Sequence, residues 1–203
     1  MSGSGFQPLR AAALAAALFS LAALLQASWI PLKAQLAQRL IERSWRYALI
    51  GESTPPWPWA DTWAAAELRV PRLGRRLLVL AGQSGRNLAF GPVLLDGTRP
   101  GSDAVISGHR DTHFRFLGEL RPGDRLELAD REGVRRYLVR GMEVVDSRRM
   151  ELLLEPGLDR LSLVTCYPFD RAAAGGPLRF VVTAYPAGWP DPGPLNPRSP
   201  SSG

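Results

Sequence analysis

From residue 64 onward, glycine, proline and aspartate divide the chain into short runs of strand-forming residues, and this division limits the fold more than any other feature. Valine and leucine recur within the runs, and the 203 residues include 20 Gly and 18 Pro. The runs predict strands at residues 67–70, 76–80, 104–107, 125–128, 134–139, 142–146, 160–165 and 178–184. Short strands in this number and spacing predict a mostly β body, either a barrel or a sandwich, with a helical turn at residues 87–92.

The N-terminal part follows a different pattern, because residues 11–32 contain no charged side chain and few polar ones. About twenty apolar residues are enough to cross a bilayer as a helix. We predict that this run is a membrane-spanning signal anchor, in preference to a signal cleaved after Ala27 or a helix of a soluble core. Only Arg10 precedes the run, whereas Lys33 and several arginines follow it, so charge alone favours a cytoplasmic body.

The remaining segments divide the chain into four parts. Helical spacing of apolar and charged residues from 31 to about 47 predicts a short amphipathic helix. Prolines in residues 54–59 end it, and the tryptophans among them either lie at a membrane interface or pack on the body, which is the safer expectation. We expect an anchor at 1–32, an amphipathic helix and Pro/Trp-rich linker at 33–63, a folded domain at 64–187 and a flexible Pro/Ser-rich tail at 188–203.

The charge pattern argues against a nucleic-acid partner. Lys and Arg number 25 against 19 acidic residues, a formal charge of +6, and Lys33 is the one lysine. The arginines are mixed with acids across residues 69–76, 121–140 and 148–160, and no recognition helix, zinc-finger spacing or aromatic RNA-binding signature accompanies them. A solvated surface, facing anionic lipid headgroups where it is close to a membrane, explains them better.

The single cysteine, Cys166, ends a run in which Leu161, Leu163 and Thr165 alternate with the residues between them. This alternation places the thiol at the C-terminal end of a strand, and a lone cysteine has no partner for an intramolecular disulfide. Free cysteine is most often a buried, small apolar residue. A catalytic role needs a base that yields the thiolate and donors for the oxyanion that follows attack.

Candidates for those two roles are few. His109 and His113, the only histidines, lie in residues 107–114, and Arg179 begins the strand after Cys166. A loop that folds back between the two strands permits the Arg179 guanidinium to lie beside the sulfur, although an isolated arginine is more often a surface residue. No metal is expected, because the histidines have neither a third nitrogen nor a second thiol to join them.

Neighbouring polar and aromatic residues each carry two interpretations. Asp111 either orients His109 or caps the turn that follows, and capping is the commoner role. Thr165 either donates to a substrate or fills the strand, while Tyr167 and Phe169 either line a substrate groove or pack on the body. Asp111, Thr165 and Tyr167 are therefore candidate substrate contacts.

Three segments together resemble the sortases, which are cysteine transpeptidases of bacterial surfaces. Residues 107–110 (Ser-Gly-His-Arg) are similar to the segment that carries the family's catalytic histidine. Residues 163–166 (Leu-Val-Thr-Cys) are similar to its nucleophile strand, and Arg179 to its arginine on the following strand. Each segment alone is weak evidence, but their order and spacing together are specific, and the similarity extends over residues 68–185.

This resemblance implies an eight-stranded sortase β-barrel and a defined chemistry. Cys166 is expected to attack the Thr-Gly carbonyl of a C-terminal sorting signal of the Leu-Pro-x-Thr-Gly type on an exported protein, forming a thioacyl intermediate. His109, in preference to His113, protonates the departing amine and later takes a proton from the acceptor. Arg179 and a backbone N–H hold the oxyanion. No cofactor is implied; an unidentified amine acceptor gives transpeptidation and water gives hydrolysis.

Within the family, the Pro-Trp-Pro-Trp cluster at residues 56–59 and the Cys-Tyr-Pro-Phe segment at 166–169 look most like sortases of Gram-negative proteobacteria, near class D. This likeness implies a single-pass protein of the inner membrane, with residues 11–32 as anchor and the catalytic domain, residues 64–187, on the periplasmic side. The expectation runs against the charge count, and we prefer the family argument because the positive-inside rule has exceptions among single-span proteins.

Two alternatives stand beside this expectation. An L,D-transpeptidase is also a β-rich, exported Cys-His enzyme, but its cysteine follows a Ser-His-Gly segment, whereas Leu-Val-Thr precedes Cys166 here. A membrane-tethered binding module with an inactive sortase-like barrel is the second alternative, and the complete set of Cys166, His109 and Arg179 argues against it.

Overall fold

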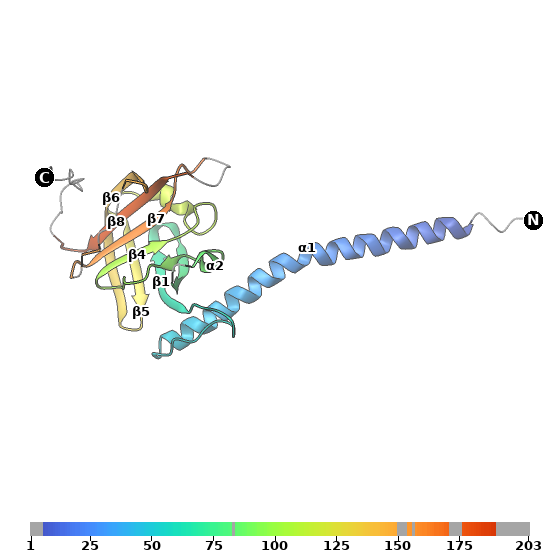
Figure 1. Ribbon diagram of the computed structural model, residues 1–203, viewed down its shortest axis with the longest axis horizontal. Helices are drawn as coiled ribbons and strands as arrows, with labels where there is room; N and C mark the ends of the chain where they lie inside the picture. The colour runs from blue at the N-terminus through green and yellow to red at the C-terminus, as the bar shows by residue number, and fades with distance from the viewer. Residues whose placement is uncertain (1–5, 83, 150–153, 156, 171–175, 190–203) are drawn as a thin grey trace, which may run out of the picture. The chain divides into compact units, whose positions relative to one another are not determined.

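The computed structural model describes residues 6–82, 84–149, 154–155, 157–170 and 176–189 (Figure 1). The chain forms two compact units, Met1–Arg39 and Leu40–Gly203. The described part of the first unit belongs to helix α1 (Phe6–Ala48), whereas the second unit holds the last turns of α1 and every strand.

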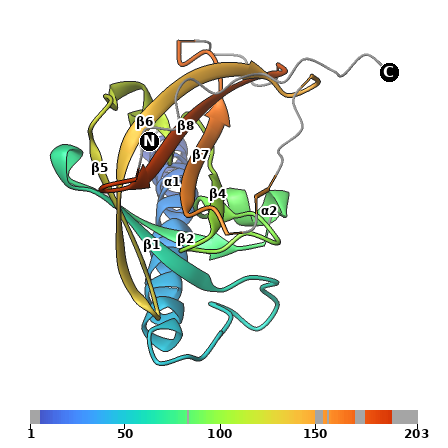
Figure 2. The same cartoon turned by 90° about the vertical axis from the view of Figure 1, so that its left-hand side faces the viewer.

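The second unit is built on a closed barrel in the order β1-β2-β3-β4-β7-β8-β6-β5, and β8, β7 and β4 lie side by side in Figure 2. Its elements are β1 (Ala64–Val70), η1 (Pro71–Leu73), β2 (Arg75–Ala81), α2 (Gly85–Leu88), β3 (Val93–Leu94), β4 (Asp103–Ser107), η2 (Arg115–Glu119), β5 (Arg125–Asp130), β6 (Gly133–Asp146), β7 (Arg160–Cys166) and β8 (Leu178–Pro186). The pairs β2–β3 and β4–β7 are parallel and the other pairs are antiparallel. The mostly β prediction is confirmed, and the barrel replaces the sandwich.

The barrel is filled by alternate side chains of its strands, because successive residues of a strand point to opposite faces. Leu68, Ile106, Leu126 and Leu163 belong to this inner core and are fully buried. The inward positions predicted for the Cys166 strand are confirmed, since Leu161, Leu163 and Thr165 are all buried; on the opposite face Ser162 is buried too, while Val164 and Cys166 are partly exposed. The strand therefore turns its cysteine away from the core.

Two strand predictions were wrong in detail. Residues 134–139 and 142–146 form one strand, β6, with a register shift between Val139 and Gly141. A glycine inside a strand often marks such a bulge, which the sequence pattern shows as a break. Strand β3 was not predicted, because two residues are too short to show periodicity.

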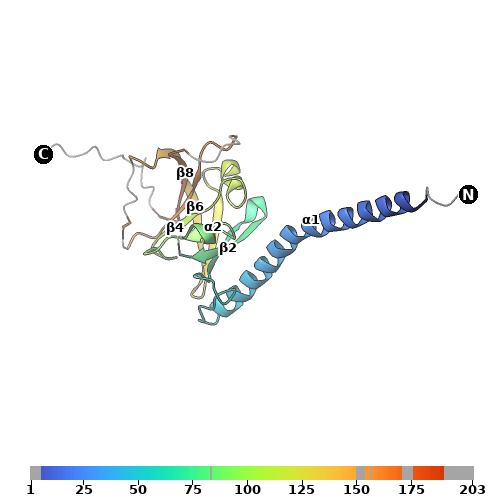
Figure 3. The same ribbon diagram turned by 45° about the vertical axis from the view of Figure 1, so that its right-hand side comes forward.

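The helical turn predicted at residues 87–92 begins earlier, as α2, with the Ser84 side chain accepting a hydrogen bond from the Asn87 N–H. Helix α2 follows β2 closely in the chain, and the Asn87 amide donates to the Ala81 carbonyl at the end of β2 at 3.4 Å (Figure 3). Asn87 is buried by this contact.

Helix α1 covers both N-terminal segments that the sequence analysis treated apart. The helix predicted from residue 31 to about 47 is present, but it is the C-terminal part of α1, which runs without interruption through Pro31 within a sequence rich in helix-forming Ala, Leu and Gln. Among the residues that the structure describes, no helix is both long and apolar enough to span a membrane.

The last turns of α1 belong to the barrel unit. Ile41 and Trp45 are buried against an outer cluster that includes Ala64 and Leu80. The Ser44 hydroxyl also donates to the Thr54 carbonyl at 2.6 Å and accepts from the Ala64 N–H at 3.0 Å. The compact unit that holds the barrel thus begins before the expected domain start at 64, although the first barrel strand begins at that residue.

The Pro/Trp-rich linker packs in part. The Trp57 ring meets Phe90 edge-on, with centroids 4.8 Å apart, as predicted for packing on the body. Trp59, in contrast, is 83% exposed. At the C-terminal end Trp189 stacks on Tyr185, and the rest of the predicted tail, residues 190–203, lies outside the described residues.

Candidate active site

Strands β4 and β7 run parallel, so both end at the same edge of the barrel. Their ladder pairs Ser107 with Val164, and the Gly108 N–H extends it by donating to the Val164 carbonyl at 3.1 Å. His109 therefore follows the end of one strand, where Cys166 ends the neighbouring strand. The pairing brings together two residues that are far apart in the sequence.

Strand β8 supplies the third predicted residue on the other side of β7. Arg179 is paired directly with Cys166 in the antiparallel ladder, where facing Cβ atoms lie about 4.5–5.5 Å apart. The Arg179 guanidinium donates to the carbonyls of Gly176 at 2.6 Å and Leu178 at 2.9 Å. The fold thus places the three predicted catalytic residues at one edge, with this guanidinium held by the chain that leads into β8.

Thr165 fixes the histidine segment to the cysteine strand. Its hydroxyl donates to the Gly108 carbonyl at 2.7 Å, and the residue is 2% exposed. A buried carbonyl that lost this donor would be costly to leave unpaired. The structure therefore gives Thr165 a positioning contact, and its predicted contact with substrate stays a prediction.

Gly108 is required by the packing beneath the histidine. A Cβ atom at this position would lie 2.8 Å from the ring of Phe114, which is fully buried. The Phe114 N–H also donates to the His109 carbonyl at 2.9 Å, closing a tight loop around the histidine backbone. A glycine directly before the histidine is thus a consequence of close approach by an aromatic ring.

Arg110 is the residue of this site that the sequence reasoning did not single out. Although His109 beside it is exposed, the Arg110 side chain is only 6% exposed. Its Nε and Nη2 atoms donate to the Asp111 carboxylate at 2.7 and 2.9 Å, and Nη1 donates to the Pro168 carbonyl at 2.5 Å. The position directly after the histidine was a signal, but spacing alone does not show burial.

Asp111 caps no turn through a hydrogen bond among the described residues. Its carboxylate, 67% exposed, is paired with the Arg110 guanidinium. This hydrogen bond lowers the pKa of Asp111 and raises the pKa of Arg110 from their ordinary values. Asp111 therefore stays charged, and its predicted contact with substrate has no test in the structure.

Aromatic rings cluster beside the end of β7. Tyr167 stacks on Phe180 with centroids 6.3 Å apart, and Phe169 meets both rings edge-on. The Tyr167 N–H donates to the Leu178 carbonyl, which extends the β7–β8 ladder past Cys166. The rings pack on one another at the predicted site, and the substrate contact of Tyr167 stays a prediction.

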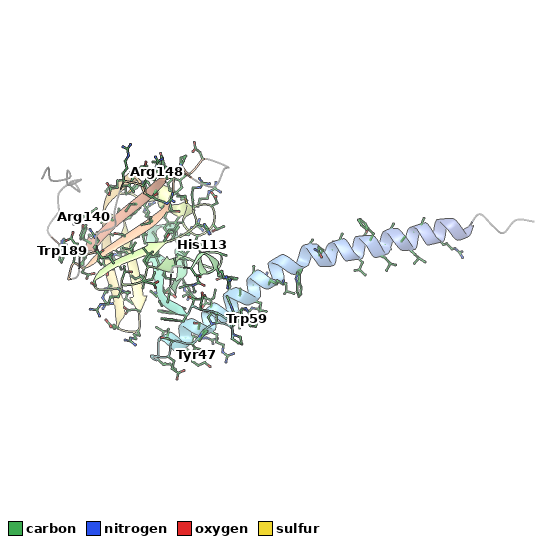
Figure 4. All side chains as sticks on the ribbon, in the orientation of Figure 1. Tyr47, Trp59, His113, Arg140, Arg148 and Trp189 are labelled. Atoms are coloured by element: carbon green, nitrogen blue, oxygen red, sulfur yellow. The ribbon has the colours of Figure 1, made fainter. Side chains whose placement is uncertain are left out.

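The second histidine, His113, lies on the loop after β4 and is labelled in Figure 4. Burial lowers its pKa from the ordinary value, and the charge of nearby His109 lowers it further, while a hydrogen bond with the Ala89 backbone opposes both. In the described part of the chain no three His, Cys, Asp or Glu residues are grouped to hold a metal ion.

A pocket of about 560 Å³ lies elsewhere, at the end of β2 and beside the loop after β3. Trp63, Ala81, Leu94 and Thr98 are among the residues that line it. None of the three predicted catalytic residues belongs to its lining, so this pocket is separate from the strand ends described above.

Comparison with known proteins identifies the domain. The family model of the Sortase domain matches residues 68–187. Sortase D of Bacillus subtilis (strain 168) is 32% identical over 123 residues, which cover 59% of this chain and 62% of that protein. The match thus spans less than two thirds of the length of this curated relative.

Solved structures share the fold at lower identity. A Clostridium perfringens Sortase D5 transpeptidase superposes with a TM-score of 0.59 at 17% identity, covering 76% of this chain and 99% of that one. Clostridium perfringens sortase C, solved with the C-terminal cell wall sorting motif, gives 0.53 at 20% identity, covering 75% and 88%. At these identities the likeness shows a common fold.

Proposed function

This chain belongs to the sortase family of cysteine transpeptidases, and we propose that it cleaves a C-terminal sorting signal of the Leu-Pro-x-Thr-Gly type on an exported protein. The observation that carries the proposal is the meeting of Cys166, His109 and Arg179 at one barrel edge, on β7, after β4 and on β8. Family membership sets aside the L,D-transpeptidase alternative.

The reaction begins at the thiol. Cys166, as thiolate, attacks the Thr-Gly carbonyl carbon, and the C–N bond breaks to leave a thioacyl enzyme. His109, exposed beside this strand end, protonates the departing amine and then takes a proton from the incoming amine or water. The acceptor's nitrogen or oxygen replaces sulfur at the carbonyl carbon and releases the free thiolate.

Arg179 acts on the oxygen of the same carbonyl. Its Nη1 donates to the carbonyls of Gly176 and Leu178, and another nitrogen of the guanidinium donates to the oxyanion that develops on attack. Because arginine is always charged and presents several donors in one plane, one nitrogen keeps a backbone contact while another turns to the substrate. A backbone N–H near Cys166 completes the oxyanion site.

The membrane anchor and location form a second part of the proposal. Residues 11–32, which carry no charge, anchor a single-pass protein in the cytoplasmic membrane with the barrel outside the cytoplasm. Support comes from the sequence and from the chemistry, since sorting signals belong to exported proteins. The single cysteine provides a test: a thiol reagent that does not cross membranes labels Cys166 in intact spheroplasts if the barrel is outside, and only after lysis if it is not.

Placement near class D is likewise a proposal. It agrees with the names of Sortase D and Sortase D5 among the similar proteins. The proteobacterial part of the expectation rests on residues 56–59 and 166–169 alone, because the curated relative comes from Bacillus.

The activity is tested with the full chain in detergent and a Leu-Pro-x-Thr-Gly peptide. We expect cleavage between Thr and Gly, a thioacyl adduct on Cys166 detected by mass spectrometry, and faster release when an amine is added. Cys166→Ala, which keeps the size and polarity of the strand end close to native, is the matched control. Absence of cleavage by the wild type, or full cleavage by Cys166→Ala, would contradict the proposal.

A further inference from the structure

An arginine buried beside an exposed catalytic histidine is unusual, because arginine side chains rarely lose contact with water unless they are paired. Arg110 is 6% exposed, and its guanidinium donates hydrogen bonds to two different segments of the chain. Asp111 belongs to the histidine loop, whereas Pro168 lies two residues after Cys166. The side chain thus joins the two loops that carry the proposed acid-base group and nucleophile.

We propose that Arg110 is a positioning residue that holds the turn after Cys166 against the segment of His109. The inference rests on the proposed function, because that function requires Cys166 and His109 to be held close enough to act on one substrate. Nη1 donates to the Pro168 carbonyl at 2.5 Å, and no ladder hydrogen bond between β4 and β7 extends beyond the one from Gly108 to Val164 among the described residues. Arg110 continues the connection where the ladder stops.

Asp111 sets the direction of this connection. Its two carboxylate oxygens accept from Nε and Nη2, a fork that fixes the plane of the guanidinium and so directs Nη1. The carboxylate is 67% exposed, and ion pairs with an exposed partner add little stability by themselves. The Asp111 carboxylate therefore acts mainly by orienting the buried Arg110 guanidinium.

The positive charge of Arg110 also lies near the Cys166 thiol, beside the turn that its hydrogen bond to Pro168 holds. The pKa of Arg110 is raised from its ordinary value, mainly by the hydrogen bond to Asp111, and the nearby Cys166 and Asp170 side chains add smaller favourable charge interactions. A cation held near a thiol favours the thiolate, which is the reacting form. The hydrogen bond to Pro168 and the positive charge therefore both favour attack by Cys166. Replacing Arg110 with lysine keeps the charge but loses the forked hydrogen bonds, so the two effects can be measured separately.

The experiment compares Arg110→Ala, Arg110→Lys and Asp111→Asn in the full chain. The first readout is the rate of alkylation of Cys166 by iodoacetamide as a function of pH, which needs no peptide and reports one thiol because the chain has one cysteine. The second is kcat and KM for the Leu-Pro-x-Thr-Gly peptide. Arg160→Lys is the control, because Arg160 forms a similar forked pair with Asp103 at the opposite ends of the same two strands.

We expect Arg110→Ala to lower kcat by about 10- to 100-fold with little change in KM, the loss typical of a misplaced reacting pair. Its rate of Cys166 alkylation falls, because the variant loses both the contact that holds the turn after Cys166 and the cation near the thiol. Arg110→Lys keeps the charge and so restores the alkylation curve, but kcat stays low because an ammonium cannot bind both Asp111 and Pro168 in one plane. Asp111→Asn gives a smaller loss of kcat.

Arg160→Lys lowers the melting temperature and leaves the alkylation curve and kcat of the folded protein unchanged. An Arg110→Ala variant with the alkylation curve and kcat of the wild type would overturn the proposal, and so would an Arg110→Lys variant with full kcat. If the wild type alkylates normally but cleaves no peptide, the proposed function fails, while the alkylation curves of the variants still decide the role of Arg110.

Discussion

The two ends of the β4–β7 strand pair hold arginines in similar forks, but the surroundings of the forks differ. Where the strands begin, Arg160 Nε donates to Asp103 Oδ1 at 2.9 Å and the Glu155 N–H donates to Oδ2 at 3.0 Å. Asp103 is 3% exposed, so this ion pair is buried and bridges the two strands. Where the strands end, the arginine pairs with its own neighbour and uses a further nitrogen to cross to the other loop.

We expect the beginning of the strands to affect mainly the stability of the protein and the end of the strands to affect mainly its activity. At the beginning of the strands the charged groups satisfy one another, which holds the register of the parallel pair. At the end the histidine is exposed and the thiol partly exposed, and the polar contacts around them fix backbone segments while leaving both predicted catalytic groups accessible. We expect variants at the two ends to fail in different assays.

The largest effect is expected at the reactive end. His109→Gln removes the group that moves protons in both half-reactions, and kcat for the sorting peptide falls by roughly 10²- to 10⁴-fold. The melting temperature stays within a few degrees of the wild type, because the side chain is exposed. Steady-state cleavage and thermal unfolding measure the two quantities, and activity within threefold of the wild type would remove His109 from the mechanism.

Breaking the buried pair gives the reverse result. Asp103→Ala removes the carboxylate that pairs with the Arg160 guanidinium at the start of the strands, and the free energy of unfolding falls by about 3–5 kcal/mol. Denaturant titration of the full chain in detergent measures the loss. The kcat of the molecules that remain folded matches the wild type; a lower value would show that the two ends are coupled.

Gly108→Ala is expected to affect both assays. The added Cβ meets the Phe114 ring at 2.8 Å, and relieving this contact costs about 1–3 kcal/mol of stability. Because the same backbone carries His109, kcat also falls. Phe114→Leu in the same chain relieves the contact and is expected to recover part of kcat; no recovery would mean that the ring is not the cause.

The smallest effect is a pH dependence at the edge of the reactive end. Burial lowers the pKa of His113, so the unfolded chain binds a proton that the folded chain resists. The wild type therefore loses stability as the pH falls through and below 6.5, the ordinary value for histidine. The His113→Gln variant has no histidine at this position and does not lose this stability. The unfolding free energy of the wild type minus that of the variant therefore decreases from pH 7 to pH 5. A constant difference would contradict the assigned burial effect.

The predictability of the fold differs from strand to strand for physical reasons. The inward alternation of Leu161, Leu163 and Thr165 follows from the two-residue period of a strand and was predicted correctly. Strand β3 shows no such period in two residues, and the bulge at Gly141 hid the continuity of β6. Helix α1 passed through Pro31 because a single missing backbone donor does not outweigh strong helix formers around it.

The candidate site was predicted through its motif and not through its surroundings. Cys166, His109 and Arg179 are recognisable because the reaction restricts their residue types. Arg110 was not recognised, since arginine next to a histidine is compatible with a solvated surface, and only the position of Pro168 in space makes it a buried connection. The ring of Phe114, which requires Gly108, is equally invisible in the spacing.

The sequence by itself determined most of the strand segments, the candidate catalytic residues and the inward positions of the Cys166 strand, because these depend on local residue type and on backbone period. The tertiary structure alone decided that β4 lies beside β7, which places His109 next to the end of the Cys166 strand, and that Arg110 spans the gap where their ladder ends. Strand pairing is chosen by closure of the whole barrel, so no local pattern records it.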